Sequence, residues 1–193
     1  MGSELDRNWI VQYTERNCQN PLNDANVAIM EPKRTPPKPG QESVWDYPRP
    51  PRVEETRKRI FVELNGVVVA DSARTKRVLE TSHPPVYYIP RDDIKMEFLK
   101  RTSQTSFCEW KGKAVYFDAV FHSRVLENFA WSYPDPNPAY SLLKDHLAFY
   151  AGLADACTVD GERVTPQPGR FYGGWITADV VGPFKGEPGS EGW

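Results

Sequence analysis

The segment Arg59-Ile60-Phe61-Val62-Glu63-Leu64-Asn65-Gly66-Val67-Val68-Val69-Ala70-Asp71 decides the fold class. Two apolar runs flank Asn65-Gly66, and this dipeptide is the strongest short hairpin signal because a type I′ turn needs a positive φ at both central residues. The segment therefore predicts an antiparallel β-hairpin.

Further short segments of β character follow, separated by turns. Strands are predicted over residues 77–80, 86–89, 105–110, 114–120, 125–133 and 146–150, and over a second hairpin, 157–159 with 162–164 around Asp160-Gly161. Residues 92–99 fit a strand or a short helix, with the strand favoured, and residues 138–144 predict a helix that has proline in its first turn. Seven or more short strands predict a single mainly β domain, either a folded antiparallel sheet or an open barrel.

The two ends of the chain differ from this β region in composition. Seven of the 18 prolines fall between Pro32 and Pro51. Proline fixes its own φ and favours extended geometry in the residue before it, so residues 1–57 predict an arm that runs along a surface. An aromatic stretch at residues 44–47 either packs onto the domain or serves as a partner motif. The β domain is then residues 58–170.

Residues 171–193 are rich in glycine and also aromatic. A flexible tail would expose these large apolar rings to water, which is unfavourable. The composition therefore predicts a tail that packs back onto the domain.

Charge and composition exclude several classes of partner. The 24 Lys+Arg and 26 Asp+Glu residues give a net charge of −2, which argues against binding nucleic acid through its phosphates. No apolar run approaches the ~20 residues that span a bilayer. The first residues show no secretory signal, and three widely spaced cysteines fit a reducing, cytoplasmic compartment. Scattered histidines and the lack of a CxxC pair indicate no metal site and no cofactor. A homodimer is compatible with the sequence.

Residues 80–88 hold several side chains that can take part in acid–base catalysis. They hold a carboxylate (Glu80), two hydroxyls, an imidazole (His83) and two phenols. The double proline after His83 restricts its backbone, which suits a general acid–base whose pKa lies near neutrality. Glu80, His83 and Tyr88 are therefore catalytic candidates. The alternative is that His83 and Ser82 satisfy backbone groups of the loop while the tyrosines pack.

A second candidate group follows Cys108. If the strand over residues 105–110 continues its alternation, Glu109 and Lys111 share one face and Cys108 and Trp110 the other. Glu109 and Lys111 are acid–base or anchoring groups if they face a pocket, and a weak surface pair if they face water. Glu109 is thus a fourth catalytic candidate. The candidate substrate-binding residues are Arg77, Ser82, Tyr87, Trp110, Lys111, Tyr116, Trp131, Tyr133 and Asp135.

Seven motifs in a fixed order connect the sequence to a known family. They are RIFVELNGVVVADS, RVLETSHPPVYYIP, FCEWKGKAVYF, AWSYPDP, HLAFY, VDGERVTPQPGRFYGGWIT and VVGPFKGEPGSEGW. From about residue 42 to residue 193 the chain resembles the DUF427 family, also labelled nucleotidyltransferase-like domain 9. The resemblance implies a β-tent or open-barrel architecture that encloses a pocket.

The nucleotidyltransferase label finds little support in the residues. The chain has no GxxxxGK[ST] phosphate loop, and the adjacent carboxylates of Asp92 and Asp93 would point to opposite faces of a strand. The leading hypothesis is an enzyme with a cofactor-independent acid–base mechanism, an isomerase, cyclase, lyase or hydrolase acting on a small, partly aromatic metabolite. The alternatives are a non-catalytic ligand-binding or interaction domain and a nucleotide-binding transferase.

Overall fold

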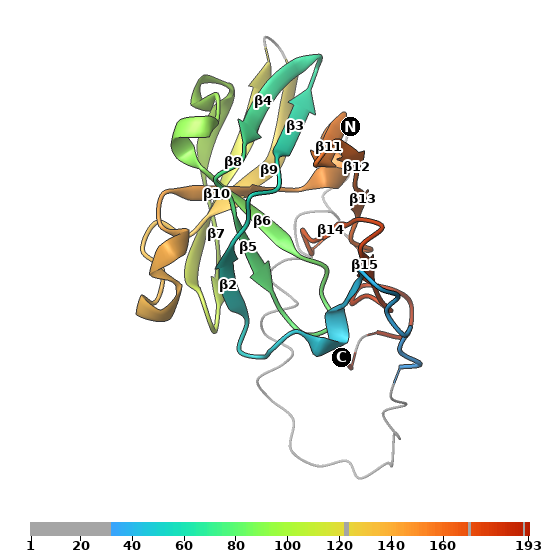
Figure 1. The fold of residues 1–193 in the computed structure, drawn as a ribbon. Helices are drawn as coiled ribbons and strands as arrows, with labels where there is room; N and C mark the ends of the chain where they lie inside the picture. The colour runs from blue at the N-terminus through green and yellow to red at the C-terminus, as the bar shows by residue number, and fades with distance from the viewer. Residues whose placement is uncertain (1–31, 122–123, 170, 191) are drawn as a thin grey trace. The chain divides into compact units, whose positions relative to one another are not determined.

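The computed structural model describes residues 32–121, 124–169, 171–190 and 192–193 (Figure 1). It confirms a mainly β domain in which antiparallel sheets and short 3₁₀ helices form an open architecture rather than a closed barrel. The first 31 residues of the predicted arm lie outside the described residues. No helix in the described ranges is long and apolar enough to cross a membrane.

The larger sheet has seven strands in the order β2-β5-β6-β10-β9-β8-β7, and all its neighbours are antiparallel. In that order the strands are β2 (Arg52–Glu55), β5 (Lys76–Leu79), β6 (Val86–Pro90), β10 (His146–Phe149), β9 (Arg124–Ser132), β8 (Gly112–Phe121) and β7 (Leu99–Cys108). The predicted arm therefore contributes an edge strand, β2, to this sheet.

A second sheet of four strands has the order β12-β11-β3-β4. Its strands are β12 (Glu162–Arg163), β11 (Ala156–Val159), β3 (Ile60–Leu64) and β4 (Val67–Ser72). Strands β3 and β4 confirm the hairpin predicted around Asn65-Gly66, whose φ angles are 52° and 69°. Strands β11 and β12 confirm the second predicted hairpin.

Short elements complete the structure. Two pairs of two-residue strands are β1 (Glu42–Ser43), parallel to β15 (Val180–Val181), and β13 (Thr165–Pro166), antiparallel to β14 (Trp175–Ile176). The 3₁₀ helices are η2 (Val44–Asp46), η3 (Arg91–Asp93), η4 (Met96–Phe98), η5 (Pro138–Leu143) and η6 (Ala151–Leu153).

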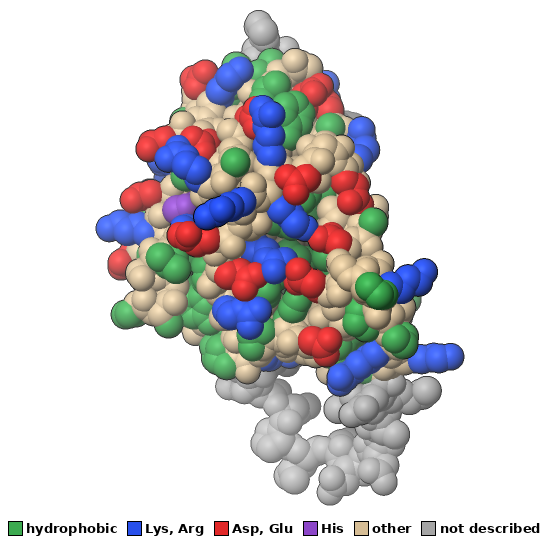
Figure 2. Space-filling model, viewed as in Figure 1, with side chains coloured by type: hydrophobic (Ala, Val, Ile, Leu, Met, Phe, Trp, Pro, Cys, Tyr) green, Lys and Arg blue, Asp and Glu red, His purple; other side chains and the backbone are tan. Residues whose placement is uncertain are grey.

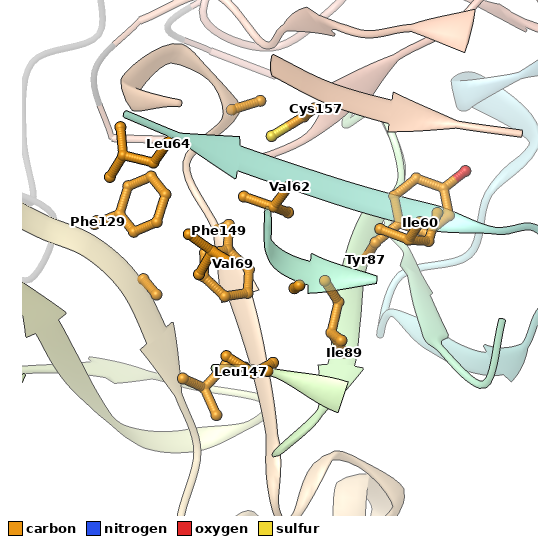
Figure 3. Close-up of a cluster of buried hydrophobic side chains, with 14 of the residues drawn as sticks. Ile60, Val62, Leu64, Val69, Tyr87, Ile89, Phe129, Leu147, Phe149 and Cys157 are labelled. Atoms are coloured by element: carbon orange, nitrogen blue, oxygen red, sulfur yellow. The ribbon is translucent and has the colours of Figure 1, made fainter. Parts of the chain in front are cut away.

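Apolar side chains of both main sheets form a first core between them (Figure 3). Val62 of β3 and Phe149 of β10 are fully buried there, together with Tyr87 and Ile89 of β6. A fully buried side chain of this size contributes ~1.5–3 kcal/mol to stability by leaving water. This core is therefore the main attachment between the two sheets.

The seven-stranded sheet also buries its other face. Successive residues of a strand point to opposite faces, so Tyr88 lies on the side opposite Tyr87. Its neighbours on that face include Trp131 and Tyr133, and helix η5 adds Tyr140. This second cluster is more polar than the first, because four of its buried side chains are tyrosines.

The arm and the C-terminal tail pack against each other and against the domain. Val44 and Tyr47 of the arm form a third buried cluster with Leu79 of β5 and Val180 of the tail. Hence the aromatic stretch at residues 44–47 packs onto the domain. The tail also packs back, as predicted, with Trp175 only 1% exposed.

The structure corrects two local predictions, the strand favoured over residues 92–99 and the bounds of the strand at residues 105–110. Helices η3 and η4 occupy most of residues 92–99 in place of the favoured strand, and Asp93 accepts hydrogen bonds from Ser72 and Arg74. The predicted strand at residues 105–110 ends at Cys108, where a turn begins.

The fold predicts a large difference between two leucine substitutions. Leu147→Ala, in the first core and 1% exposed, should lower the free energy of unfolding by ~2–5 kcal/mol through lost burial and a cavity. Leu142→Ala, on η5 and 51% exposed, should change it by less than ~0.5 kcal/mol. Urea unfolding measures both values. Equal losses would contradict this placement of the core.

Candidate functional site

The bend between β5 and β6 carries Glu80 and His83 on a tight turn. The backbone N–H of His83 donates to the carbonyl oxygen of Glu80 at 2.9 Å. Ser82, at the third position, has a φ of 68°, in the left-handed region that non-glycine residues rarely adopt. Pro84 and Pro85 follow and restrict the return into β6. The turn thus holds Glu80 and His83 close together.

Segments from both ends of the described chain hold this bend in place. The Ser82 N–H donates to the carbonyl of Val44 in the arm at 3.0 Å, and the Ser82 carbonyl accepts from the N–H of Lys185 in the tail at 2.8 Å. The guanidinium of Arg49 donates to the carbonyl of Thr81 at 3.0 Å. Backbone and side-chain contacts therefore position the bend from two sides.

Lys111 brings a buried positive charge to Glu80. Its side chain is only 10% exposed, and its Nζ lies 4.0 Å from Glu80 Oε2 and 5.9 Å from the ring centroid of Tyr133. Arg49 approaches the same carboxylate, with its Nε 3.6 Å from Glu80 Oε1. Both distances to Glu80 exceed those of a normal hydrogen bond. Glu80 thus lies between two cations and makes a tight bond to neither.

The turn before β8 explains why Lys111 points inward. Asn137 donates through its side-chain amide to the Trp110 carbonyl at 2.7 Å, and its backbone N–H donates to the Lys111 carbonyl at 3.1 Å. Gly112 follows with a φ of 95°. The alternation predicted through Glu109 and Lys111 is therefore wrong, since Glu109 is exposed while Lys111 is buried.

His83 is largely buried beneath the tail. Its Nδ1 lies 3.0 Å from Nε2 of Gln167, and its ring meets the ring of Tyr172 edge-on at a centroid distance of 4.8 Å. Burial lowers the pKa of His83 to about 3, assisted by the positive charges of Arg49, Lys185 and Lys111. His83 is consequently neutral at physiological pH, and the expected pKa near neutrality is not found.

Aromatic side chains of the second cluster lie beside these polar groups. The indole N–H of Trp131 donates to the hydroxyl of Tyr88 at 3.2 Å, and the ring of Tyr150 lies 4.5 Å from that of Trp131. Burial raises the pKa of Tyr88, Tyr133 and Tyr150 above the ordinary value, so these phenols remain protonated. They can donate hydrogen bonds but are poor bases.

The tail passes directly over this aromatic face. A Cβ on Gly173 would lie 2.1 Å from Cη2 of Trp131, so only glycine fits at this position. The Tyr150 hydroxyl donates to the carbonyl of Phe171 at 3.3 Å. The residues just before and after Tyr172 are thus fixed to the sheet, and Tyr172 is held against His83.

Several predicted site residues lie next to this group. Trp110 packs against the second cluster, and Tyr116 belongs to it, with its hydroxyl 2.8 Å from the Ser106 hydroxyl. Ser82 is 1% exposed, and its Oγ has no hydrogen-bond partner in the described part of the chain. The structure thus brings together Glu80, His83, Tyr88, Trp110, Lys111, Tyr116, Trp131 and Tyr133.

Other predicted residues lie elsewhere. Glu109 and Asp135 are exposed, and Tyr87 points into the first core. Arg77 forms ion pairs with Glu42 at 2.9 Å and Glu54 at 2.5 Å. Lys/Arg and Asp/Glu side chains are intermixed over the face shown in Figure 2, which is typical of solvated surface pairs.

Sequence reasoning missed three residues of the site. Arg49 lies in the arm, and Gln167 and Tyr172 lie more than 80 residues after His83. A lone glutamine between two prolines carries no chemical signature in the sequence. Only the packing of the arm, of the segment after β13 and of the tail against the bend brings these side chains to the site.

The described residues show a cavity away from the bend, but no cluster of metal ligands. No group of three or more His, Cys, Asp or Glu side chains in the described ranges could hold a metal ion. A cavity of about 120 Å³ lies between the β3–β4 hairpin, the β8–β9 hairpin and the end of helix η6, where Leu64, Phe121 and Leu153 line it. None of the predicted site residues lines this cavity.

Comparison with known proteins identifies a family for the β domain. No curated protein matches the chain. Residues 52–160, more than half of the chain, match the family described as a domain of unknown function, DUF427. This match includes the bend and Lys111, but not Arg49 or Gln167. The resemblance predicted from the seven motifs is confirmed, and the chain belongs to the DUF427 family.

Proposed function

We propose that Glu80, His83 and Lys111 form the site of a small-molecule enzyme that binds an organic anion with an aromatic part. The observation that carries this proposal is the environment of Lys111. Its side chain is only 10% exposed and makes no hydrogen bond within the described ranges, and its ion-pair partner Glu80 lies at the long distance of 4.0 Å, measured from Nζ to Oε2. A largely buried lysine is costly unless its charge is well paired, and the long contact to Glu80 leaves room for an anionic partner.

The charges around His83 support the same ligand class. Arg49, Lys111 and Lys185 all act on His83, whereas Glu80 is the carboxylate that faces two of them. Lys185 is engaged by the carbonyls of Ser190 and Trp193. Arg49 likewise donates to the carbonyl of Thr81, so Lys111 is the cation best suited to a ligand. The rings of Tyr133 and Trp110 beside Lys111 would pack against an aromatic part of the ligand.

The chemistry that suits these groups is proton transfer next to a carbonyl. Glu80 would take a proton from the carbon beside the carbonyl group, and the C–H electrons would form the C=C bond of an enolate. The negative charge then develops on the carbonyl oxygen, where Lys111 and the neutral imidazole of His83 could stabilise it. In a substrate whose enolate is conjugated with a further C=C bond, Glu80 returns the proton to the far carbon; the carbonyl bond re-forms and the C=C bond has moved, which completes an isomerisation.

A non-catalytic binding domain is the second candidate. The low pKa of His83 favours it, because proton transfer needs groups that take up and release protons. The imidazole of His83 stays neutral and the phenols of Tyr88 and Tyr133 stay protonated, so Glu80 is the base that remains among the grouped residues. Such a domain would bind the same anions without converting them. A nucleotide-binding transferase, the third candidate, would instead be stabilised against heat by ATP with Mg²⁺.

Anion binding should depend on Lys111. Lys111→Met should weaken binding of benzoate and phenyl phosphate by about 10- to 100-fold, because a charge-assisted hydrogen bond contributes ~1.5–3 kcal/mol. Lys113→Met, at an exposed position of the same hairpin, is the matched control and should have little effect. Isothermal titration calorimetry measures both. Equal affinities in the two variants would refute the assignment of Lys111.

Catalysis should depend on Glu80. With phenylpyruvate in D₂O, the wild-type protein should accelerate hydrogen–deuterium exchange beside the carbonyl, measured by proton NMR. Glu80→Gln should slow this exchange by ~10²–10⁴-fold, since a positioned general base contributes that much. Exposed Glu109→Gln is the control. Binding of phenylpyruvate by the wild type without any exchange would favour the non-catalytic domain.

The neutral state of His83 predicts a dependence of stability on pH. In the unfolded chain His83 takes up a proton as the pH falls through about 6.5, whereas in the folded chain it does so only near 3. Between these values protonation favours the unfolded chain, so the free energy of unfolding falls by up to ~1.4 kcal/mol per pH unit from this group. Above about pH 6.5 the group contributes no pH dependence.

His83→Gln should remove this component. Urea unfolding at several pH values between 7 and 4 would show a shallower decline in the variant than in the wild type. The carboxylates of the chain titrate in both proteins and cancel in the comparison. Parallel curves would show that His83 is not held neutral.

A further inference from the structure

Gln167 connects the bend to the tail through three hydrogen bonds. It follows β13, is 3% exposed and lies 84 positions after His83 in the sequence. Its Oε1 accepts the backbone N–H of Gly174 at 3.0 Å, and its Nε2 donates to the backbone carbonyl of Lys185 at 2.8 Å. The same Nε2 lies 3.0 Å from Nδ1 of His83.

The two backbone partners determine which way the amide of Gln167 faces. An N–H group can only donate and a carbonyl oxygen can only accept. If the amide were rotated by half a turn, its NH₂ would face the N–H of Gly174 and its oxygen would face the carbonyl of Lys185. Both contacts would be repulsive in a buried position, where an unsatisfied polar group is costly. The NH₂ group therefore faces His83.

This orientation has a consequence for the imidazole. An amide NH₂ can only donate, so Nδ1 of His83 has to be the acceptor and carries no proton. In a neutral imidazole the proton then resides on Nε2. We infer that Gln167 is a positioning residue that holds His83 as the neutral tautomer protonated on Nε2.

The surroundings of the ring agree with this tautomer. Arg49, Lys111 and Lys185 are the cations that act on His83, and Glu80 is the nearby carboxylate on the same bend. A second proton on Nδ1 would place two N–H donors against each other and add a fourth positive charge. Tyr172 meets the ring edge-on and leaves the hydrogen bond to Gln167 intact.

The tautomer narrows the ligand class, and this step rests on the proposed function. A neutral ring with its proton on Nε2 can donate a hydrogen bond to the ligand. It offers the ligand no base, because Nδ1 already accepts from Gln167. The group that meets His83 must therefore be an acceptor oxygen, such as a carbonyl, carboxylate or phosphate oxygen, and cannot be a hydroxyl that needs deprotonation. His83 would thus hydrogen-bond the oxygen on which charge develops, while Glu80 moves the proton.

The tautomer can be measured directly without any ligand. In the ¹⁵N-labelled full chain at pH 7, two-bond ¹H–¹⁵N correlations of the imidazoles distinguish a protonated ring nitrogen from an unprotonated one. The His83→Gln variant identifies the signals of His83. We expect a protonated Nε2 and an unprotonated Nδ1. A protonated Nδ1, or averaging between the two tautomers, would overturn the inference.

Two variants test whether Gln167 causes this state. Gln167→Glu replaces the donor by a carboxylate, which should draw a proton onto Nδ1, and Gln167→Met should let the ring average between tautomers. Gln104→Glu, on edge strand β7 and four strands from β6, is the matched control and should leave the signals unchanged. Near-UV circular dichroism verifies folding. Unchanged His83 signals in a folded Gln167→Glu variant would refute a positioning role.

Ligand binding separates this inference from the proposed function. If the Nε2–H group of His83 contacts the anion, Gln167→Glu should weaken benzoate binding by about tenfold, because one hydrogen bond to the anion is lost. The expected tautomer together with benzoate binding that is insensitive to Lys111→Met would support the role of Gln167 and refute the proposed site. Benzoate binding that is weakened by Lys111→Met, together with a protonated Nδ1, would support the proposed site and refute the role of Gln167.

Discussion

Burial of both faces of the seven-stranded sheet is the constraint on which the structure depends. Because side chains alternate along a strand, each residue of β6 belongs either to the core between the sheets or to the aromatic cluster on the far side. Tyr87 and Tyr88 are neighbours of the same residue type, yet only Tyr88 lies on the face that carries the polar residues of the candidate site. The same alternation directs Trp131 of β9 and Tyr116 of β8 toward that face.

The arm and the tail help to build the candidate site, because both bind the bend between β5 and β6. Val44 and Lys185 bind the backbone of Ser82 from two sides, and Arg49 binds Thr81. Without these contacts the bend would present backbone groups without partners, and unpaired buried backbone groups are rare in folded proteins. The family match at residues 52–160 includes the strands that carry the bend, while parts of the chain outside the match hold it.

The charges of the candidate site favour a different role for each of His83, Glu80 and Lys111. Burial and three neighbouring cations keep His83 neutral, so a role in hydrogen bonding suits it better than proton uptake. Glu80 lies between Arg49 and Lys111 without a short bond to either, which leaves its oxygens available to a ligand. Lys111 lies against the ring of Tyr133, where a cation and an aromatic surface meet. We propose that an aromatic anion fits this combination.

Most of the strands and the bend follow from the sequence alone, because local rules govern both. The Asn65-Gly66 and Asp160-Gly161 turns require a positive φ that these residues tolerate, and the double proline after His83 enforces an irregular connection. It also placed Glu80, His83 and the aromatic residues among the candidates. Only the tertiary structure decided that Lys111 turns inward while Glu109 does not, since Asn137 holds that turn from a distant loop. Likewise, Gln167 reaches His83 because the segment after β13 packs against the bend, and contacts over 84 residues leave no local pattern in a single sequence.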